Sequence, residues 1–82
     1  MQEELKGIIR ENLIEIIPEL EGEDFTNDET FVDLGANSLD RGELITLTLE
    51  TIELEISRIE FVKAKTINEL ADLIAEKRQA LV

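Results

Sequence analysis

The chain has 82 residues, with 20 acidic and 8 basic side chains and neither Cys nor His. A chain of this length forms one domain, 1–82, and it offers no disulfide, no thiolate nucleophile, no Cys/His zinc site and no imidazole base. The net charge of −12 argues against binding to nucleic acid or to an anionic membrane, and it favours a partner with a basic docking surface.

The composition is that of a soluble, folded chain. Apolar residues make up 43% of the sequence and aromatic residues 4%, so we expect a core built from Leu, Ile and Val. No stretch approaches the ~20 apolar residues that a membrane span needs, and the early charges are unlike a signal peptide. We therefore expect a cytoplasmic monomer.

The first segment is predicted to be an amphipathic helix. Its apolar residues recur at i, i+3 and i+4: Leu5, Ile8, Ile9, Leu13, Ile16, Ile17 and Leu20. Pro18 disfavours the helical conformation in the residue before it, so the helix should end near Ile17. The stretch 19–37 has no sustained period and predicts a long loop, with one helical turn near 29–33. Four apolar residues are expected to hold this loop against the core: Phe25, Phe31, Val32 and Leu34.

A second helix should begin at about Ser38. The side chain of Asn37 or of Ser38 can accept hydrogen bonds from the free amides of its first turn. The apolar face of this helix comprises Leu44, Ile45, Leu47, Thr48, Leu49 and Ile52. Its solvent face carries carboxylates at Asp40, Glu43, Glu50 and Glu53. Gly42 is a weak point, because glycine in a helix interior costs ~1 kcal/mol relative to Ala.

Two capping-box patterns follow. The residues 57–60, SRIE, predict the start of a short helix, and 66–69, TINE, predict the start of the last helix. No alternating run bounded by turn residues indicates a strand. The predicted fold is therefore all-α: a four-helix bundle with three longer helices, one short third helix and a long loop between the first and second helices.

Few residues are candidates for chemistry. The clustered carboxylates are interpreted as a solvated acidic face, because none lies in a pattern that would place it in an apolar pocket. Nothing matches a calcium loop, a Gly-rich phosphate loop or the G-x-S-x-G of serine hydrolases. On local evidence Ser38 is a helix N-cap, although a helix N-terminus also stabilises a covalently attached phosphate.

The region around Ser38 resembles a known motif. Residues 33–40 read DLGANSLD, which is similar to the D-L-G-x-D-S-L-D signature of acyl carrier proteins. The resemblance covers nearly the whole chain, since IIPEL at 16–20, the long loop, and TINEL at 66–70 occur in family order. The resemblance implies a carrier rather than an enzyme.

The resemblance also implies a cofactor and a set of partners. Ser38 would carry 4'-phosphopantetheine, which a separate phosphopantetheinyl transferase attaches from coenzyme A, and the thiol of this arm would hold an acyl thioester. Acyl-loading and acyl-accepting enzymes, such as a ketosynthase, an acyltransferase or an HMG-synthase-like enzyme, would be the partners. The residues expected to be recognised by these partners are Asn37, Leu39, Asp40, Arg41, Glu43, Thr46, Glu50 and Glu53.

Three residues depart from the commonest family pattern. Asn37 stands where Asp is usual, Arg41 adds a positive charge to an acidic surface, and Gly42 replaces an apolar residue or Ala. Arg41 is expected to select against some partners, and Gly42 either loosens the helix start or lets another group approach closely.

Two segments bear on the subtype. Residues 35–41 with Glu43, and residues 62–73, resemble the free-standing carriers of bacterial polyketide β-branching cassettes, which hold acetyl units for an HMG-synthase-like enzyme. A general fatty-acid or polyketide carrier is the other subtype. A different class of function, in which Ser38 only caps a helix, is a non-carrier acidic adaptor that docks a basic partner.

Overall fold

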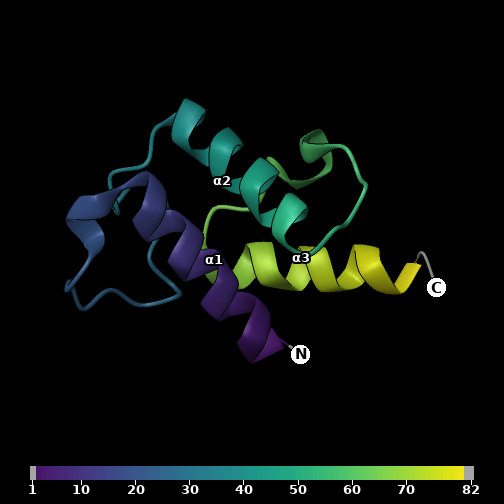
Figure 1. Cartoon of the computed structure of the whole chain (residues 1–82), viewed down its shortest axis with the longest axis horizontal. Helices are drawn as coiled ribbons and strands as arrows, with labels where there is room; N and C mark the ends of the chain where they lie inside the picture. The colour runs from purple at the N-terminus through teal and green to yellow at the C-terminus, as the bar shows by residue number, and fades with distance from the viewer. Residues whose placement is uncertain (1, 81–82) are drawn as a thin grey trace.

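The computed structural model describes residues 2–80. Three α-helices run from Gln2–Ile16 (α1), Ser38–Thr51 (α2) and Ile67–Ala80 (α3). Two short 3-10 helices, η1 (Pro18–Leu20) and η2 (Arg58–Phe61), lie in the connections. α1 crosses in front of α3, and α2 lies above both in Figure 1. None of the helices within residues 2–80 is long and apolar enough to cross a membrane.

The end of α1 follows the prediction from Pro18. The last helical residue is Ile16, and the Ile17 N–H still donates to the Leu13 carbonyl at 2.8 Å. The chain then forms η1, which the sequence did not predict. Pro18 has a fixed φ that suits the first position of such a turn, and its carbonyl accepts from the Glu21 N–H at 3.0 Å.

The predicted apolar stripes form one core. Its fully buried members come from all three helices and from both long connections: Ile9, Leu13, Phe31, Leu44, Phe61, Ile67, Leu70 and Ile74. Phe25, Phe31 and Leu34 are buried as expected. The expectation for Val32 was wrong, because 69% of its surface is exposed. Phe31 and Leu34 are three residues apart on the inner side of one turn, which directs Val32 outward.

The long loop is tied to the rest of the molecule by backbone hydrogen bonds. The predicted helical turn occurs slightly later than expected, over 31–35, where the Leu34 N–H donates to the Thr30 carbonyl at 3.1 Å. The Phe31 N–H donates to the Lys65 carbonyl at 2.8 Å, next to an isolated bridge between Thr30 and Thr66. No strand is present within residues 2–80.

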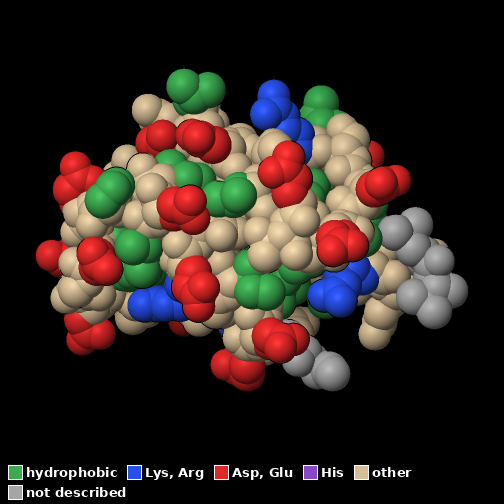
Figure 2. Space-filling model, viewed as in Figure 1, with side chains coloured by type: hydrophobic (Ala, Val, Ile, Leu, Met, Phe, Trp, Pro, Cys, Tyr) green, Lys and Arg blue, Asp and Glu red, His purple; other side chains and the backbone are tan. Residues whose placement is uncertain are grey.

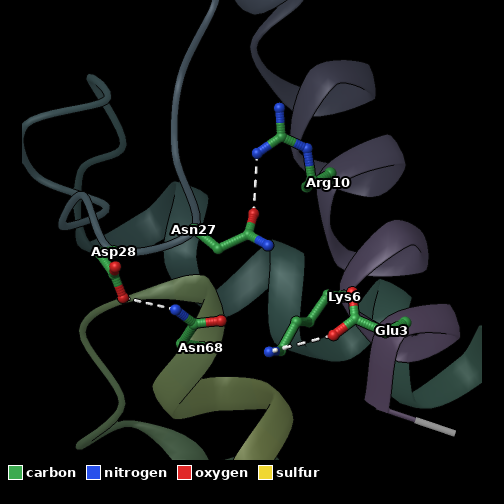
Figure 3. A network of polar contacts seen from close by, with 6 residues as sticks. All are labelled: Glu3, Lys6, Arg10, Asn27, Asp28 and Asn68. Carbon is green, nitrogen blue, oxygen red and sulfur yellow. Dashed lines mark hydrogen bonds and ion pairs between the residues drawn. The ribbon is translucent and has the colours of Figure 1, made fainter.

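Side chains complete this attachment. Arg10 of α1 donates to the Phe25 carbonyl at 2.9 Å and to the Asn27 side-chain oxygen at 2.8 Å, and its guanidinium lies 3.9 Å from the Phe25 ring centroid. Asn68 of α3 donates to the Asp28 carboxylate. Figure 3 shows that these contacts hold the loop from two sides, α1 and α3. The loop is therefore an ordered part of the fold.

The short helix differs from its prediction. It forms as the 3-10 helix η2, so residues 2–80 contain three α-helices rather than four. The Ser57 hydroxyl accepts from the Ile59 N–H at 3.4 Å, while the Glu60 carboxylate pairs with Lys77 of α3 at 3.1 Å instead of closing a capping box. The segment forms one turn, anchored by the fully buried Phe61.

At the start of α3, one of the two hydrogen bonds of the predicted capping box forms. The Thr66 hydroxyl accepts from the Glu69 N–H at 3.0 Å, as the pattern requires. The Glu69 carboxylate accepts from the Lys65 N–H at 2.8 Å rather than from Thr66. The side chains of Thr66 and Glu69 therefore both accept backbone hydrogen bonds at the start of α3.

Candidate functional site: the start of α2

Asn37 is the residue that caps α2. Its side-chain oxygen accepts from the Asp40 N–H at 2.8 Å, and the Asp40 carboxylate accepts from the Asn37 N–H at 3.2 Å. This reciprocal pair is a capping box, and it decides between the two cap candidates that the sequence offered. Asp40 thereby has a structural role in addition to its surface charge.

Ser38 is the first residue of α2 and is exposed. Because Asn37 caps the helix, the Ser38 hydroxyl has no capping role to fill. None of the hydrogen bonds formed within residues 2–80 uses this hydroxyl. Capping, which was the local explanation for a serine at this position, therefore does not apply to Ser38.

The segment before Ser38 is firmly placed. The Ala36 N–H donates to the Phe31 carbonyl at 2.9 Å, and only 3% of the Ala36 surface is exposed. Gly35 adopts φ +95°, in the left-handed region that favours glycine, and this reverses the chain between the turn and the helix. The exposed Ser38 hydroxyl thus follows a segment in which Ala36 is buried and its backbone N–H is hydrogen bonded.

Two grooves meet on α2 beside this serine. The first lies between α1 and α2 and is lined by Glu15, Ile16, Asp40, Glu43, Thr46, Leu47 and Glu50. The second lies between α2 and η2 and is lined by Ser38, Leu39, Gly42, Glu43, Thr46 and Arg58. Glu43 and Thr46 belong to both grooves, so they form the ridge between them.

Most of the predicted recognition residues gather here. We define the docking face as Asn37, Leu39, Asp40, Arg41, Glu43, Thr46 and Glu50, all in the cap or body of α2. Leu39 is 79% exposed, although large apolar side chains are usually buried. Asn37 and Arg41 line a third hollow, which they share with Val32, Gly35, Ala36 and Ser38. Ser38 therefore has open surface on two sides.

Glu53, the remaining predicted recognition residue, also ends α2. It follows α2 with φ +56°, the left-handed conformation of a helix C′ residue. Its N–H donates to the Glu50 carbonyl at 3.2 Å, and the Leu54 N–H donates to the Leu49 carbonyl at 2.9 Å. This is the Schellman pattern that ends a helix, and Glu53 lines none of the three hollows around Ser38.

Arg58 is a residue of this region that the sequence did not single out. Its guanidinium Nη1 donates to the Thr46 hydroxyl at 3.5 Å and lies 3.7 Å from the position a Cβ would take at Gly42. A Cβ at Gly42 would make ordinary van der Waals contact with this nitrogen, so the position of Arg58 does not require a glycine here. The exposed Ile59 and Val62 lie next to Arg58 in sequence.

Acidic side chains dominate the surface. Figure 2 shows them spread over the face in view, while at its upper edge basic groups lie between hydrophobic ones. In the view of Figure 1 this edge belongs to α2 and η2. The region beside Ser38 is thus mixed in character, within a molecule whose net charge is −12.

Comparison with known proteins identifies the family. The model of the phosphopantetheine attachment site matches residues 5–74. The polyketide biosynthesis acyl-carrier-protein AcpK of Bacillus subtilis (strain 168) is 45% identical over 69 residues, covering 84% of each chain. An acyl carrier protein of Buchnera aphidicola subsp. Acyrthosiphon pisum (strain Tuc7) is 38% identical over 78 residues, covering 94% of this chain and 91% of its own length.

A solved structure is similar over the same length. A chain in the crystal structure of the curacin biosynthetic pathway HMG synthase in complex with acetyl donor-ACP superposes with a TM-score of 0.88. The two chains are 39% identical, and the match covers 93% of this chain and 97% of that one. This chain therefore belongs to the acyl carrier protein family, and it is a carrier with a phosphopantetheine attachment domain, not a catalyst.

Proposed function

We propose that Ser38 bears the 4'-phosphopantetheine arm and that the arm carries an acetyl group to an HMG-synthase-like enzyme of polyketide β-branching. The observation that supports this attachment site is that the Ser38 hydroxyl is exposed at the first position of α2. Asn37 caps the helix, so the Ser38 hydroxyl is not needed for capping. A separate phosphopantetheinyl transferase would join this oxygen to the phosphate of the arm, taken from coenzyme A.

The surroundings of Ser38 fit such a group. The free amides at the start of α2 favour an anion, and the open hollows on both sides leave room for a bulky substituent. The arm supplies a thiol, which a chain without cysteine lacks. The ordered turn before Ser38 and the start of α2 would hold the attachment point in place. The partner enzymes would supply the catalytic groups.

The docking face supports the choice of partner class. Asp40, Glu43 and Glu50 give one side of α2 a row of carboxylates, which complements a basic enzyme surface. The likeness to AcpK and to a chain solved with an HMG synthase supports a β-branching enzyme over the ketosynthase or acyltransferase partners of general fatty-acid carriers. A monomeric state and a cytoplasmic location are part of the proposal.

Two measurements test the proposal. Intact mass is recorded before and after incubation with coenzyme A, magnesium and a broad-specificity phosphopantetheinyl transferase. We expect a gain of one phosphopantetheine in the unchanged chain and none in Ser38→Ala. A chain that neither carries nor gains the group would be an adaptor, and modification of Ser38→Ala would refute the attachment site.

The acetyl step is tested separately. The holo chain is loaded with acetyl and offered to an HMG-synthase-like enzyme and, in parallel, to a fatty-acid ketosynthase. Transfer to the first enzyme and poor use by the second are expected. Efficient elongation by the ketosynthase together with no transfer to the HMG-synthase-like enzyme would refute the β-branching assignment.

A further inference from the structure

We propose that Arg58 is a specificity-determining residue that binds a carboxylate on the surface of the acyl-accepting enzyme, from a position next to Gly42 of α2. This inference rests on the proposed function, because it concerns how the acyl-accepting enzyme recognises the same carrier. It adds a second cationic group, besides Arg41, to a docking face whose acidic side chains are Asp40, Glu43 and Glu50.

The position of Arg58 is the first observation. Arg58 is the first residue of η2, yet its side chain extends across the groove to α2. Nη1 lies 3.5 Å from the Thr46 hydroxyl and packs over Gly42 at 3.7 Å from the missing Cβ. Ser38 lines the same groove. The guanidinium is therefore held beside the surface that an enzyme must cover in order to receive the acyl group.

The free charge of Arg58 is the second observation. Within residues 2–80 the ion pairs are Lys6–Glu3 and Lys77–Glu60, so the Arg58 guanidinium has no carboxylate within ion-pair distance. Its described hydrogen bond is the single one to Thr46, which leaves most of its donors available. A planar guanidinium with free donors fits a carboxylate in a two-bond geometry.

The apolar residues around Arg58 define the rest of the contact. Leu39 on α2 is 79% exposed and Ile59 next to Arg58 is 69% exposed. A stable interface combines such apolar anchors with charged groups that pair across it. The partner site is thus a carboxylate flanked by apolar side chains, next to the basic surface that meets Glu43 and Glu50.

Gly42 provides a way to displace Arg58 without changing it. An alanine Cβ would stand at ordinary van der Waals distance from Nη1. A leucine side chain would extend further and occupy the place of the guanidinium.

The test compares variants of the acetyl-loaded chain with one HMG-synthase-like enzyme. For Arg58→Ala we expect KM for the carrier to rise about fivefold or more, as for loss of an interface anchor, with kcat unchanged. Arg58→Glu should raise KM further, and Arg58→Lys less. Gly42→Leu should reproduce the effect of Arg58→Ala, and the double variant Gly42→Leu/Arg58→Ala should add little. Gly42→Ala should leave KM nearly unchanged, because its Cβ would stand at ordinary van der Waals distance from Nη1. Arg78→Ala, an exposed arginine in the last turn of α3, is the matched control.

The readouts separate recognition from folding and from the proposed function. Each variant is checked for its unfolding midpoint and for mass gain at Ser38. We expect both to match the unchanged chain for the Arg58 variants, since Arg58 is exposed. An unchanged KM for both Arg58→Ala and Arg58→Glu, with normal loading and acetyl transfer, overturns the inference and leaves the proposed function intact. Failure of the unchanged chain to load or to transfer acetyl overturns both.

Discussion

The Asn12 side-chain amide donates a hydrogen bond to the Thr48 hydroxyl at 3.2 Å, inside the interface between α1 and α2. Thr48 is fully buried and Asn12 is 8% exposed. A second acceptor, the Thr51 hydroxyl, lies at 3.5 Å from the same amide nitrogen. These polar contacts join α1 to the helix that carries Ser38, within an interface that is otherwise apolar.

Removing one partner of this contact should destabilise the fold. Thr48→Val keeps the shape but leaves the buried Asn12 amide without its nearer acceptor, so we expect a loss of about 1–2 kcal/mol in the free energy of unfolding. Asn12→Leu/Thr48→Val replaces both polar groups and should recover most of that loss. Urea unfolding of the two variants measures the difference, and equal losses for both would contradict the explanation.

The cap of α2 should contribute measurably to stability. Asn37→Ala removes the acceptor for the Asp40 N–H, and an N-cap change of this kind costs about 1 kcal/mol. Asn37→Asp supplies an equivalent acceptor and should stay within a few tenths of a kcal/mol of the unchanged chain. Thermal and urea unfolding test the pair; the same loss in both variants would show that the cap is not the cause.

Glu43 offers a clean test of the acidic docking face. Its carboxylate is exposed and takes part in no hydrogen bond or ion pair within residues 2–80, so Glu43→Lys should leave stability nearly unchanged while reducing transfer to a partner with a basic surface about tenfold. Asp40→Lys is a poorer test, because it also removes the capping-box acceptor for Asn37.

The measurement for Glu43 is the steady-state KM of the carrier at two ionic strengths. A partner contact through charge predicts that the difference between variant and unchanged chain shrinks at high salt. Glu76→Lys on α3 is the control for net charge, since it makes the same change outside the docking face. Equal changes in KM for Glu43→Lys and Glu76→Lys would show that the partner responds to overall charge and not to the docking face.

Glu53 should be replaceable with a gain in stability. A non-glycine residue in the left-handed region costs roughly 1–2 kcal/mol, so Glu53→Gly should raise the free energy of unfolding by up to ~1 kcal/mol once the added flexibility of the unfolded chain is counted. Urea unfolding measures this. Partner transfer should change little, since Glu53 lines none of the hollows described around the start of α2; a large loss of transfer would support its predicted recognition role.

The features predicted correctly are those with local causes. The end of α1 before Pro18, the start of α2 at Ser38 and the Thr66 cap of α3 each depend on groups within four residues along the chain. The burial of the apolar stripes likewise follows from helical periodicity, which a sequence displays directly. These local rules, with the resemblance around Ser38, were sufficient to predict the all-α fold class, while Ser38 as the attachment residue stays a prediction.

The features that were missed depend on the packing of distant segments. Arg58 reaches Thr46, Asn12 meets Thr48 across two helices, and Glu60 pairs with Lys77 of α3 rather than capping its own turn. No spacing along the chain encodes these contacts. The sequence by itself determined where α1 ends, where α2 and α3 begin and which stripe of each helix is apolar, because those depend on neighbours three or four residues away. Only the tertiary structure decided that Val32 faces solvent, that Glu53 ends α2 and that Arg58 stands over Gly42 beside Ser38, because the direction of a side chain in a turn or connection is set by the elements packed around it.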